Sequence, residues 1–181
     1  MKSKNFILSI LVSVLSMLAN AANIESTSKD MIGNVATINN VGEKLSTTRF
    51  ASVNMDCIRD NMTGLIWTKN ANLFVIQNWA NAKTKVAEMN TTSSATGYHL
   101  CGYSDWRLPN QNELVSLFKS AAVRSNQVTW LISQGFTNVQ PDSYWSSSVG
   151  GLGAWFVNMS SGYSSSLDVY FSFYVWPVRG G

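Results

Sequence analysis

Hydrophobic residues recur at helical spacing between Trp79 and Met89. Trp79, Ala82, Val86 and Met89 stand at positions i, i+3, i+7 and i+10, whereas the residues between them are mostly polar. This spacing places all four on one side of a helix, so the segment is predicted to be helical with one buried face. The polar stretch 90–97 is expected to end the helix.

A second helix is predicted after Pro109. Asn110 can accept hydrogen bonds from the first-turn N–H groups, and Glu113 can reach back to the backbone of Asn110, which is the capping-box arrangement. The expected buried face of this helix consists of Leu114, Leu117, Phe118 and Ala121. No further helix is predicted after Gly135.

Two strands and a turn are predicted before the first helix. Apolar residues recur loosely at alternate positions between Arg49 and Ile58, which favours a strand leading to Cys57. Asp60 to Gly64 has the composition of a turn, because Asp and Asn side chains bond nearby N–H groups and Gly permits a positive φ. The apolar run Leu65-Ile66-Trp67 is expected to be the next strand.

The C-terminal part alternates short apolar runs with Gly-containing turns, which predicts strands at 154–158, 164–168 and 170–175. In the last strand, alternation should bury one set of side chains, namely Val169, Phe171, Phe173 and Val175. The opposite face would display Tyr170, Ser172 and Tyr174. From Tyr144 onward, Asp168 and Arg179 are the only charged residues.

The N-terminus has the pattern of an export signal. Lys2 and Lys4 precede an apolar run from Phe6 to Leu18, and Ala19-Asn20-Ala21 is the small-x-small pattern that signal peptidase cleaves after. This apolar run is shorter than the roughly 20 residues that a membrane-spanning helix needs. We therefore expect residues 1–21 to be a removed signal peptide, and the protein to be periplasmic, secreted or displayed on the cell surface.

The rest of the chain is expected to comprise a lead-in and one domain. Residues 22–48 are rich in Ser, Thr, Asn and Lys, which predicts a loosely ordered segment with one short strand near Asn34–Ile38. Residues 49–181 contain all seven tryptophans, whose large side chains can fill a single core. No later apolar stretch is long enough to span a membrane, so the mature chain is expected to have no membrane span.

Charge argues against nucleic acid as a partner. The formal net charge of +3 includes Lys2 and Lys4, so cleavage leaves eleven Lys and Arg residues against ten Asp and Glu, a net charge of +1. Nucleic acid binding depends on clustered Lys and Arg residues that neutralise phosphates. The sequence contains no such cluster.

Cys57 and Cys101 are the only cysteines of the chain. Because exported proteins fold in an oxidising compartment, the two are expected to form a disulfide. Closing a loop of this length would stabilise the fold by roughly 4 kcal/mol in the chain-entropy model, less any strain. The alternative is a reactive or metal-binding thiol pair, although such thiols usually lie close together in sequence or beside a histidine.

Four short aromatic motifs, punctuated by Gly and Pro, follow one another along the chain: Thr63-Gly64-Leu65-Ile66-Trp67, Cys101 to Pro109, Tyr144 to Ser148 and Val175 to Gly181. Their order resembles the bacterial domain family named after the C-terminal domain of Legionella collagen-like adhesins, over roughly residues 49–181. Arg107-Leu108-Pro109 followed by Glu113 also resembles the helix-opening segment of formylglycine-generating-enzyme relatives. One departure is Trp176, which stands where relatives of the adhesin domain usually have Arg.

The resemblance implies an α+β, C-type-lectin-like fold, with two helices packed on short, mostly antiparallel strands and one disulfide. Structural roles are expected for six residues within or next to these motifs, namely Asp60, Trp67, Trp106, Arg107, Trp145 and Arg179. We expect the three tryptophans to be core residues. Arg107 is expected to pair with Asp60 or Asp105, because the Arg fork can hold a carboxylate through two hydrogen bonds.

The sequence offers little that supports catalysis or metal binding. His99 is the only histidine, and no nucleophile or paired-histidine motif is present. Gln140-Pro141-Asp142 resembles the sugar-selecting tripeptide of galactose-type C-type lectins, but calcium needs six to eight oxygen ligands and few carboxylates lie in this region. We expect no catalytic residue, no metal and no cofactor; an enzyme similar to the formylglycine-generating type remains an alternative.

The expected function is the binding of an extracellular glycan or protein through a Tyr- and Ser-rich C-terminal surface: Tyr163, Ser165, Asp168, Tyr170, Ser172, Tyr174 and Trp176. Its composition resembles antibody paratopes, in which rigid Tyr and adaptable Ser suit varied ligands. A receptor diversified by a retroelement is therefore an alternative. Packing of these aromatics beneath a loop or against another protomer is a further one, and a homo-oligomer remains open.

Overall fold

The computed structural model describes residues 26–29, 35–38, 44–119 and 126–181. The chain divides into two compact units, residues 1–48 and residues 49–181. The expected signal peptide, residues 1–21, lies outside the described residues. None of the helices in the described part is long and apolar enough to cross a membrane.

The first unit contains an antiparallel three-stranded sheet in the order β1-β2-β3. The strands are β1 (Ser26–Lys29), β2 (Val35–Ile38) and β3 (Lys44–Thr47). The strand expected near Asn34–Ile38 corresponds to β2, whereas β1 and β3 were not expected. Both are rich in Ser, Thr and Lys, and such segments lack the apolar alternation by which a half-buried strand is recognised.

The second unit begins with an antiparallel four-stranded sheet in the order β12-β6-β5-β4. Its strands are β4 (Phe50–Ser52), β5 (Cys57–Asp60), β6 (Ile66–Thr68) and β12 (Val178–Arg179). The single strand expected between Arg49 and Ile58 is therefore wrong: two strands are joined by a turn. The Asn54 side chain accepts a hydrogen bond from the Asp56 N–H at 2.9 Å, an Asx turn that reverses the chain.

A five-stranded sheet forms the other half of this unit, in the order β10-β9-β8-β11-β7. Its strands are β7 (Ile76–Asn78), β8 (Ser143–Gly150), β9 (Gly153–Asn158), β10 (Ser164–Leu167) and β11 (Ser172–Tyr174). All neighbours are antiparallel except β8 and β11, which run parallel. The strands β7 and β8 were not expected; β8 is rich in Ser and its pairing with β9 is irregular between Trp145 and Val149.

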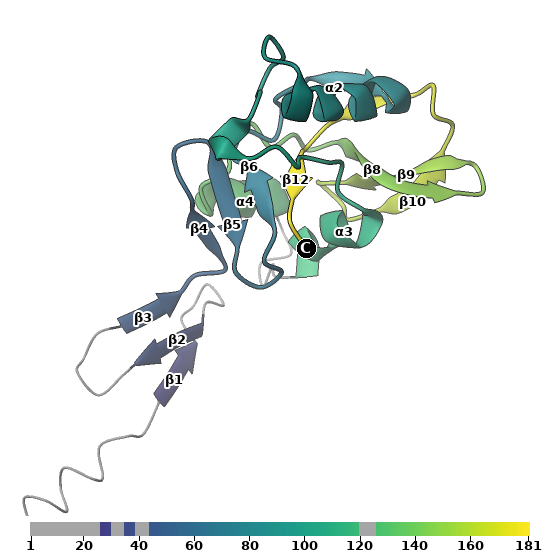
Figure 1. The fold of residues 1–181 in the computed structure, drawn as a ribbon. Coiled ribbons are helices and arrows are strands. Elements are labelled where there is room, and N and C mark those ends of the chain that lie inside the picture. The colour runs from purple at the N-terminus through teal and green to yellow at the C-terminus, as the bar shows by residue number, and fades with distance from the viewer. Residues whose placement is uncertain (1–25, 30–34, 39–43, 120–125) are drawn as a thin grey trace, which may run out of the picture. The chain divides into compact units, whose positions relative to one another are not determined.

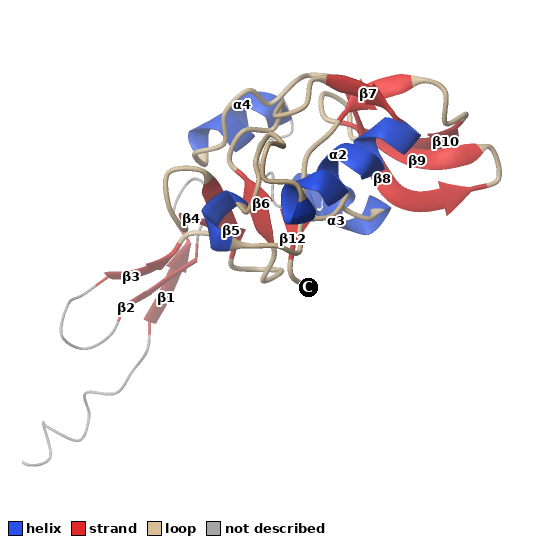
Figure 2. Ribbon diagram, turned by 45° about the horizontal axis from the view of Figure 1, so that its top comes forward, coloured by secondary structure: helices blue, strands red, loops and turns tan. Residues whose placement is uncertain are grey.

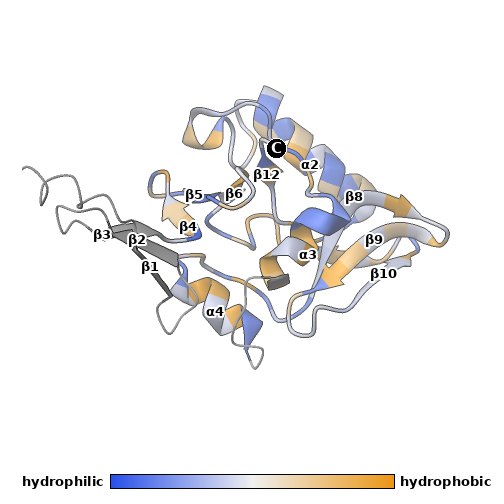
Figure 3. Ribbon diagram, turned by 90° about the horizontal axis from the view of Figure 1, so that it is seen from below, coloured by the Kyte–Doolittle hydropathy of each residue, from blue (hydrophilic) through white to orange (hydrophobic). Residues whose placement is uncertain are grey.

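The α+β fold class is confirmed, but the described residues contain three α-helices rather than two: α2 (Trp79–Thr91), α3 (Gln111–Lys119) and α4 (Gln127–Ser133). A short 3₁₀ turn spans Leu100–Gly102. The helix α4 was missed because seven residues are too few for an apolar period to stand out. Figure 2 shows the three helices around the strands of the second unit, and Figure 3 shows that hydrophobic and hydrophilic residues alternate around α4.

The predicted capping box opens α3. The Asn110 side chain accepts from the Glu113 N–H at 2.9 Å, and the Glu113 carboxylate accepts from the Asn110 N–H at 2.7 Å. Leu114 and Leu117 are fully buried, as expected, and Phe118 is partly buried. Ala121 lies outside the described residues.

The core has one hydrophobic cluster on each face of the five-stranded sheet. On one face, Tyr144 and Val157 belong to the cluster that contains Leu117 of α3. On the other, Trp145 and Phe156 belong to the cluster of α2, with Ala82, Val86 and Met89. Figure 1 shows the sheet between α2 and α3. Adjacent residues of a strand point to opposite faces, so the pairs 144/145 and 156/157 connect the two clusters.

The disulfide between Cys57 and Cys101 is confirmed. It joins the first residue of β5 to the 3₁₀ turn, with 6.4 Å between the two Cα atoms, which is within the usual range for a disulfide. Cys57 is fully buried in the cluster of α2. The bridge therefore ties the four-stranded sheet to the segment that follows α2.

Candidate functional site

The structure does not bring the expected ligand-binding residues onto one surface. Tyr163 and Tyr170 are both exposed, but they lie beyond opposite ends of β10. Asp168 and Ser172 are exposed on the side of Tyr170, and Ser165 is half-buried within the strand. A ligand that contacts Tyr170 would therefore meet Asp168 and Ser172 before it reached Tyr163.

One member of the expected set, Trp176, lies inside the protein, and a second, Tyr174, is partly buried. Trp176 has no exposed surface, its ring packs edge-on against Trp67 and Phe136 at 5.5 and 5.1 Å, and its Nε1 donates to the Thr68 carbonyl at 2.9 Å. The Tyr174 ring is half-buried, 5.5 Å from the ring of Tyr144. The prediction that Trp176 belongs to an exposed surface is therefore wrong.

Trp176 is buried because β11, the strand that precedes it in sequence, is shorter than expected. The expected alternation over residues 170–175 assumed one continuous strand, but β11 comprises only Ser172–Tyr174. Beyond these three residues the period of two no longer holds. Phe171, expected in the core, is consequently exposed in the loop before β11, and Trp176 turns inward after it.

The structure instead forms an exposed apolar surface at one end of the five-stranded sheet. Two segments contribute to it: the β8–β9 turn and the loop between β10 and β11. Their exposed side chains, with the exposed fraction of each, are Val149 (71%), Leu152 (72%), Tyr170 (84%) and Phe171 (53%). Together with Asp168, these residues are called the hairpin-tip surface below. Figures 1 and 2 show both segments at the same end of the sheet.

Gly153 accounts for the close approach of the two segments. It has a φ of +137°, and a Cβ at this position would collide with the carbonyl oxygen of Leu167 and lie 3.2 Å from the Asp168 Cα. Only glycine allows the β8–β9 turn to contact the end of β10 in this way. The loop that carries Tyr170 therefore lies directly beside the turn that carries Leu152.

Asp168 shapes the loop that presents the two aromatic residues. Its carboxylate accepts from the Tyr170 N–H at 3.0 Å, and its carbonyl accepts from the Phe171 N–H at 3.2 Å. An Asx turn of this kind fixes the backbone without help from other elements. Among the residues of the predicted site, Asp168 therefore has a structural role, because it holds the backbone of Tyr170 and Phe171.

Val149 and Leu152 were missed at the sequence level, although a signal was present. Gly150 and Gly151 stand between them, and Gly-Gly between apolar runs is a typical hairpin turn. In the structure Gly150 pairs with Gly153, which leaves a two-residue turn, Gly151 and Leu152. Recognising this hairpin would have placed both side chains at an exposed tip.

Arg107 pairs with Glu113, so the expectation of Asp60 or Asp105 is wrong. Its two terminal nitrogens donate to the two carboxylate oxygens of Glu113, each at 2.8 Å, and they also donate to the Gly180 and Leu108 carbonyls. The hydrogen bond with Glu113 raises the pKa of Arg107, and burial opposes this effect. Glu113 thereby caps α3 and fixes Arg107 with the same carboxylate.

The two aspartates that were expected beside Arg107 pair with other arginines. Asp60 is fully buried with Arg49, at 2.7 Å from Nη2 to Oδ2. Asp105 is exposed and binds Arg179, which also lies 4.1 Å above the Tyr103 ring. The hydrogen bond from Arg179 lowers the pKa of the Asp105 carboxyl, against a smaller opposing effect of burial.

Replacing Glu113 with glutamine should lower the free energy of unfolding by about 1–2 kcal/mol, because it removes the charge from both the cap and the Arg107 pair. Urea unfolding measures the change. Glu88→Gln on α2 is the control, because none of the three ion pairs in the described residues involves Glu88, and it should stay within roughly 0.5 kcal/mol of the parent. Equal effects of the two substitutions would contradict the double role of Glu113.

The three tryptophans expected in the core are buried. Trp145 donates from Nε1 to the Gln77 carbonyl at 2.9 Å, and Trp106 donates to the Leu100 carbonyl at 3.3 Å. The Nε1 of Trp67 is buried without a hydrogen-bond partner in the described structure.

The segment Gln140-Pro141-Asp142 forms the turn that leads into β8. The Tyr144 hydroxyl accepts from the Gln140 N–H at 2.8 Å, and burial raises the pKa of Tyr144 above its usual range. The Asp142 carboxylate accepts from the Ser143 N–H at 2.6 Å. Among the described residues, no group of three or more His, Cys, Asp or Glu side chains lies close enough to hold a metal ion.

Comparison with known proteins identifies the family. The Lcl C-terminal domain matches residues 56–179, which include both cysteines, the hairpin-tip surface and all strands from β5 to β11. No match was found among the curated proteins. Because the matched region covers more than half of the chain, this protein belongs to the Lcl C-terminal domain family.

Proposed function

We propose that the protein is an exported, non-catalytic binding module of the adhesin type, and that the hairpin-tip surface contacts its extracellular ligand, a glycan or a protein. The observation that carries the proposal is the exposure of four large apolar side chains on two adjacent turns. A monomeric protein rarely exposes such side chains together unless they meet a partner.

The surface combines exposed side chains with a fixed backbone. The β8–β9 turn is paired down to Gly150 and Gly153, and the Asx turn of Asp168 holds the loop of Tyr170 and Phe171. Binding residues are commonly found on loops that a rigid scaffold positions. Because the backbone is held before the ligand arrives, less conformational entropy is lost on binding.

Binding rather than catalysis is proposed because two side chains that could serve as a general acid or base, Glu113 and His99, make structural contacts instead. The carboxylate of Glu113 is held by Arg107 and by the Asn110 N–H. The His99 ring hydrogen-bonds the Asn90 carbonyl at 3.1 Å and stacks on Tyr98. Both groups are engaged in structural contacts, which supports a role in holding the scaffold.

The decisive experiment is a binding screen of the exported protein against glycans and host-surface proteins, followed by titration of each hit. Tyr170→Ala and Leu152→Ser should each weaken binding by about tenfold, which corresponds to roughly 1.4 kcal/mol. Tyr163→Ala is the matched control, because it removes an equally large exposed ring from the opposite end of β10. It should leave binding unchanged.

Two results would count against the proposal. If Tyr163→Ala weakens binding and Tyr170→Ala does not, the ligand contacts the other end of β10. If neither substitution affects a confirmed ligand, the exposed turns are not the binding surface.

A further inference from the structure

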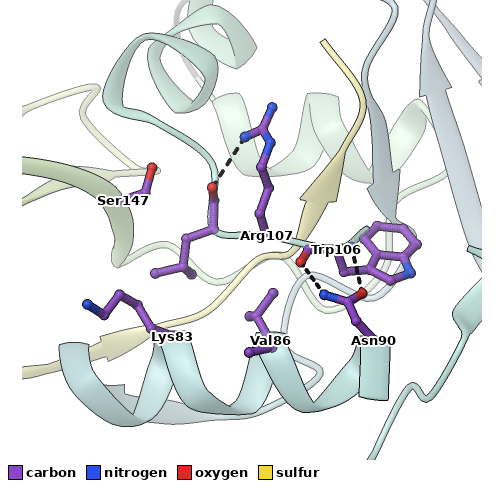
Figure 4. A pocket seen from close by; sticks show the side chains of 8 residues that line it. Lys83, Val86, Asn90, Trp106, Arg107 and Ser147 are labelled. Atoms are coloured by element: carbon purple, nitrogen blue, oxygen red, sulfur yellow. Dashed lines mark hydrogen bonds between the residues drawn. The ribbon is translucent and has the colours of Figure 1, made fainter. Parts of the chain in front are cut away.

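A hollow of about 290 Å³ lies between α2 and the segment 106–108 (Figure 4). It is lined by one side of α2, the facing segment and one residue of β8: Lys83, Val86, Ala87, Asn90, Trp106, Arg107, Leu108 and Ser147. Its volume is at the lower limit of protein sites for small molecules, which span roughly 300–1,000 Å³.

Two of the polar side chains that line the hollow already form hydrogen bonds within the protein. The Asn90 amide donates to the Trp106 carbonyl and accepts from the Trp106 N–H, both at 2.8 Å. The Arg107 guanidinium is bound to Glu113 and points away from α2 (Figure 4). These contacts fix the wall opposite α2 but offer little to a ligand.

Lys83 is different, because it is a cation whose charge is not neutralised. The three ion pairs in the described part of the chain all involve arginines, and none includes Lys83. None of the residues that line the hollow is acidic. A negatively charged group in the hollow would therefore meet one uncompensated positive charge.

The ammonium group is also held in place. It lies 3.9 Å above the centre of the Trp79 ring, and the Trp79 Nε1 donates to the Ser146 carbonyl at 2.8 Å. A ring fixed by this hydrogen bond stabilises the cation above its face. The lysine side chain therefore has less freedom to lose when it binds an anion.

We propose that this hollow binds a small organic anion, with its charged group on the Lys83 ammonium and a compact apolar body against Val86, Ala87 and Leu108. The positive charge of Lys83 favours an anionic ligand. The volume of the hollow limits the apolar part of the ligand to about a single ring. The hollow shares no residue with the hairpin-tip surface, and the inference does not depend on the proposed adhesive function.

The test uses the exported, isotope-labelled protein and three probes in nuclear magnetic resonance titrations. Cyclohexanecarboxylate carries both the charge and the apolar body, cyclohexanecarboxamide lacks the charge, and acetate lacks the body. We expect the first probe to bind, with shift changes at the amides of Val86, Ala87 and Leu108. The other two should bind at least tenfold more weakly.

Variants separate the site from general charge effects. Lys83→Gln should weaken cyclohexanecarboxylate binding by about tenfold, the effect of one charged hydrogen bond. Lys85→Gln removes the same charge from another side of α2 and should leave binding unchanged. Ala87→Phe should abolish binding, because Ala87 is exposed at the hollow and a larger side chain there fills it without disturbing the core.

The inference is overturned if cyclohexanecarboxylate causes no shift changes at these amides. It is also overturned if Lys83→Gln and Lys85→Gln bind the probe equally well, because a nonspecific charge effect would then explain the binding. Either result would leave the hairpin-tip proposal intact, since none of these residues belongs to that surface.

Discussion

Asp60→Ala is expected to lower the free energy of unfolding by about 3–5 kcal/mol, the usual effect of removing one partner of a buried ion pair. The Asp60 carboxylate is fully buried and accepts from Arg49 Nε at 3.1 Å, from Arg49 Nη2 at 2.7 Å and from the Met62 N–H at 3.0 Å. Without it, the Arg49 charge remains buried without its carboxylate. Urea unfolding followed by tryptophan fluorescence measures the change.

The control for this substitution is Asp105→Ala. Asp105 also makes two hydrogen bonds to an arginine, at 2.7 and 2.8 Å, but its side chain is half exposed. Solvent screens an exposed pair, so its loss should cost about 1 kcal/mol or less. If the two variants were equally stable, burial of the Arg49 pair would contribute nothing and the expected result would be wrong.

Trp176→Ala should lower the free energy of unfolding by a similar amount, about 3–5 kcal/mol, because it leaves a large cavity in the core. The ring contacts Trp67, Phe136 and Tyr144, with centroid distances between 5.1 and 5.5 Å. The Thr68 carbonyl would also lose the hydrogen bond from Nε1. Trp176→Phe should have a smaller effect, since it removes the donor and only part of the ring and keeps most of the apolar volume.

Tyr170→Ala is the matched control for Trp176→Ala. Both remove an aromatic ring from the same C-terminal segment, but Tyr170 is almost fully exposed. Its substitution should change the free energy of unfolding by roughly 0.5 kcal/mol or less. Opposite results, with Tyr170 essential and Trp176 dispensable for stability, would mean that the chain after β11 packs differently.

The predictable part of the fold has strong local signals. The apolar stripe from Trp79 to Met89 defined α2, and the reciprocal bonds of Asn110 and Glu113 defined the beginning of α3. Both signals depend only on residues within a few positions of each other. The disulfide followed from the presence of just two cysteines in a chain expected to be exported.

The errors concern choices that local pattern does not determine. Arg107 has three acidic residues as candidate partners, Asp60, Asp105 and Glu113, and only the folded chain places Glu113 against it. Trp176 follows β11 in sequence, and the period of two gives no indication that the strand ends at Tyr174. The hairpin-tip surface therefore shares Asp168 and Tyr170 with the site predicted from the sequence. That prediction also included Trp176, which is buried, and omitted Val149 and Leu152.

The pairing of β12 with β6 has a consequence for the order of folding. Trp176 donates a hydrogen bond to Thr68, 108 positions earlier in the sequence, and Val178 pairs with Trp67 in the antiparallel register of β12 and β6. These contacts can form only after the chain has been synthesised as far as Val178, and folds with many contacts between distant residues reach their native state slowly. If the protein leaves the cytoplasm as proposed, slow folding would leave the new chain unfolded for translocation, and the disulfide between Cys57 and Cys101 would form afterwards.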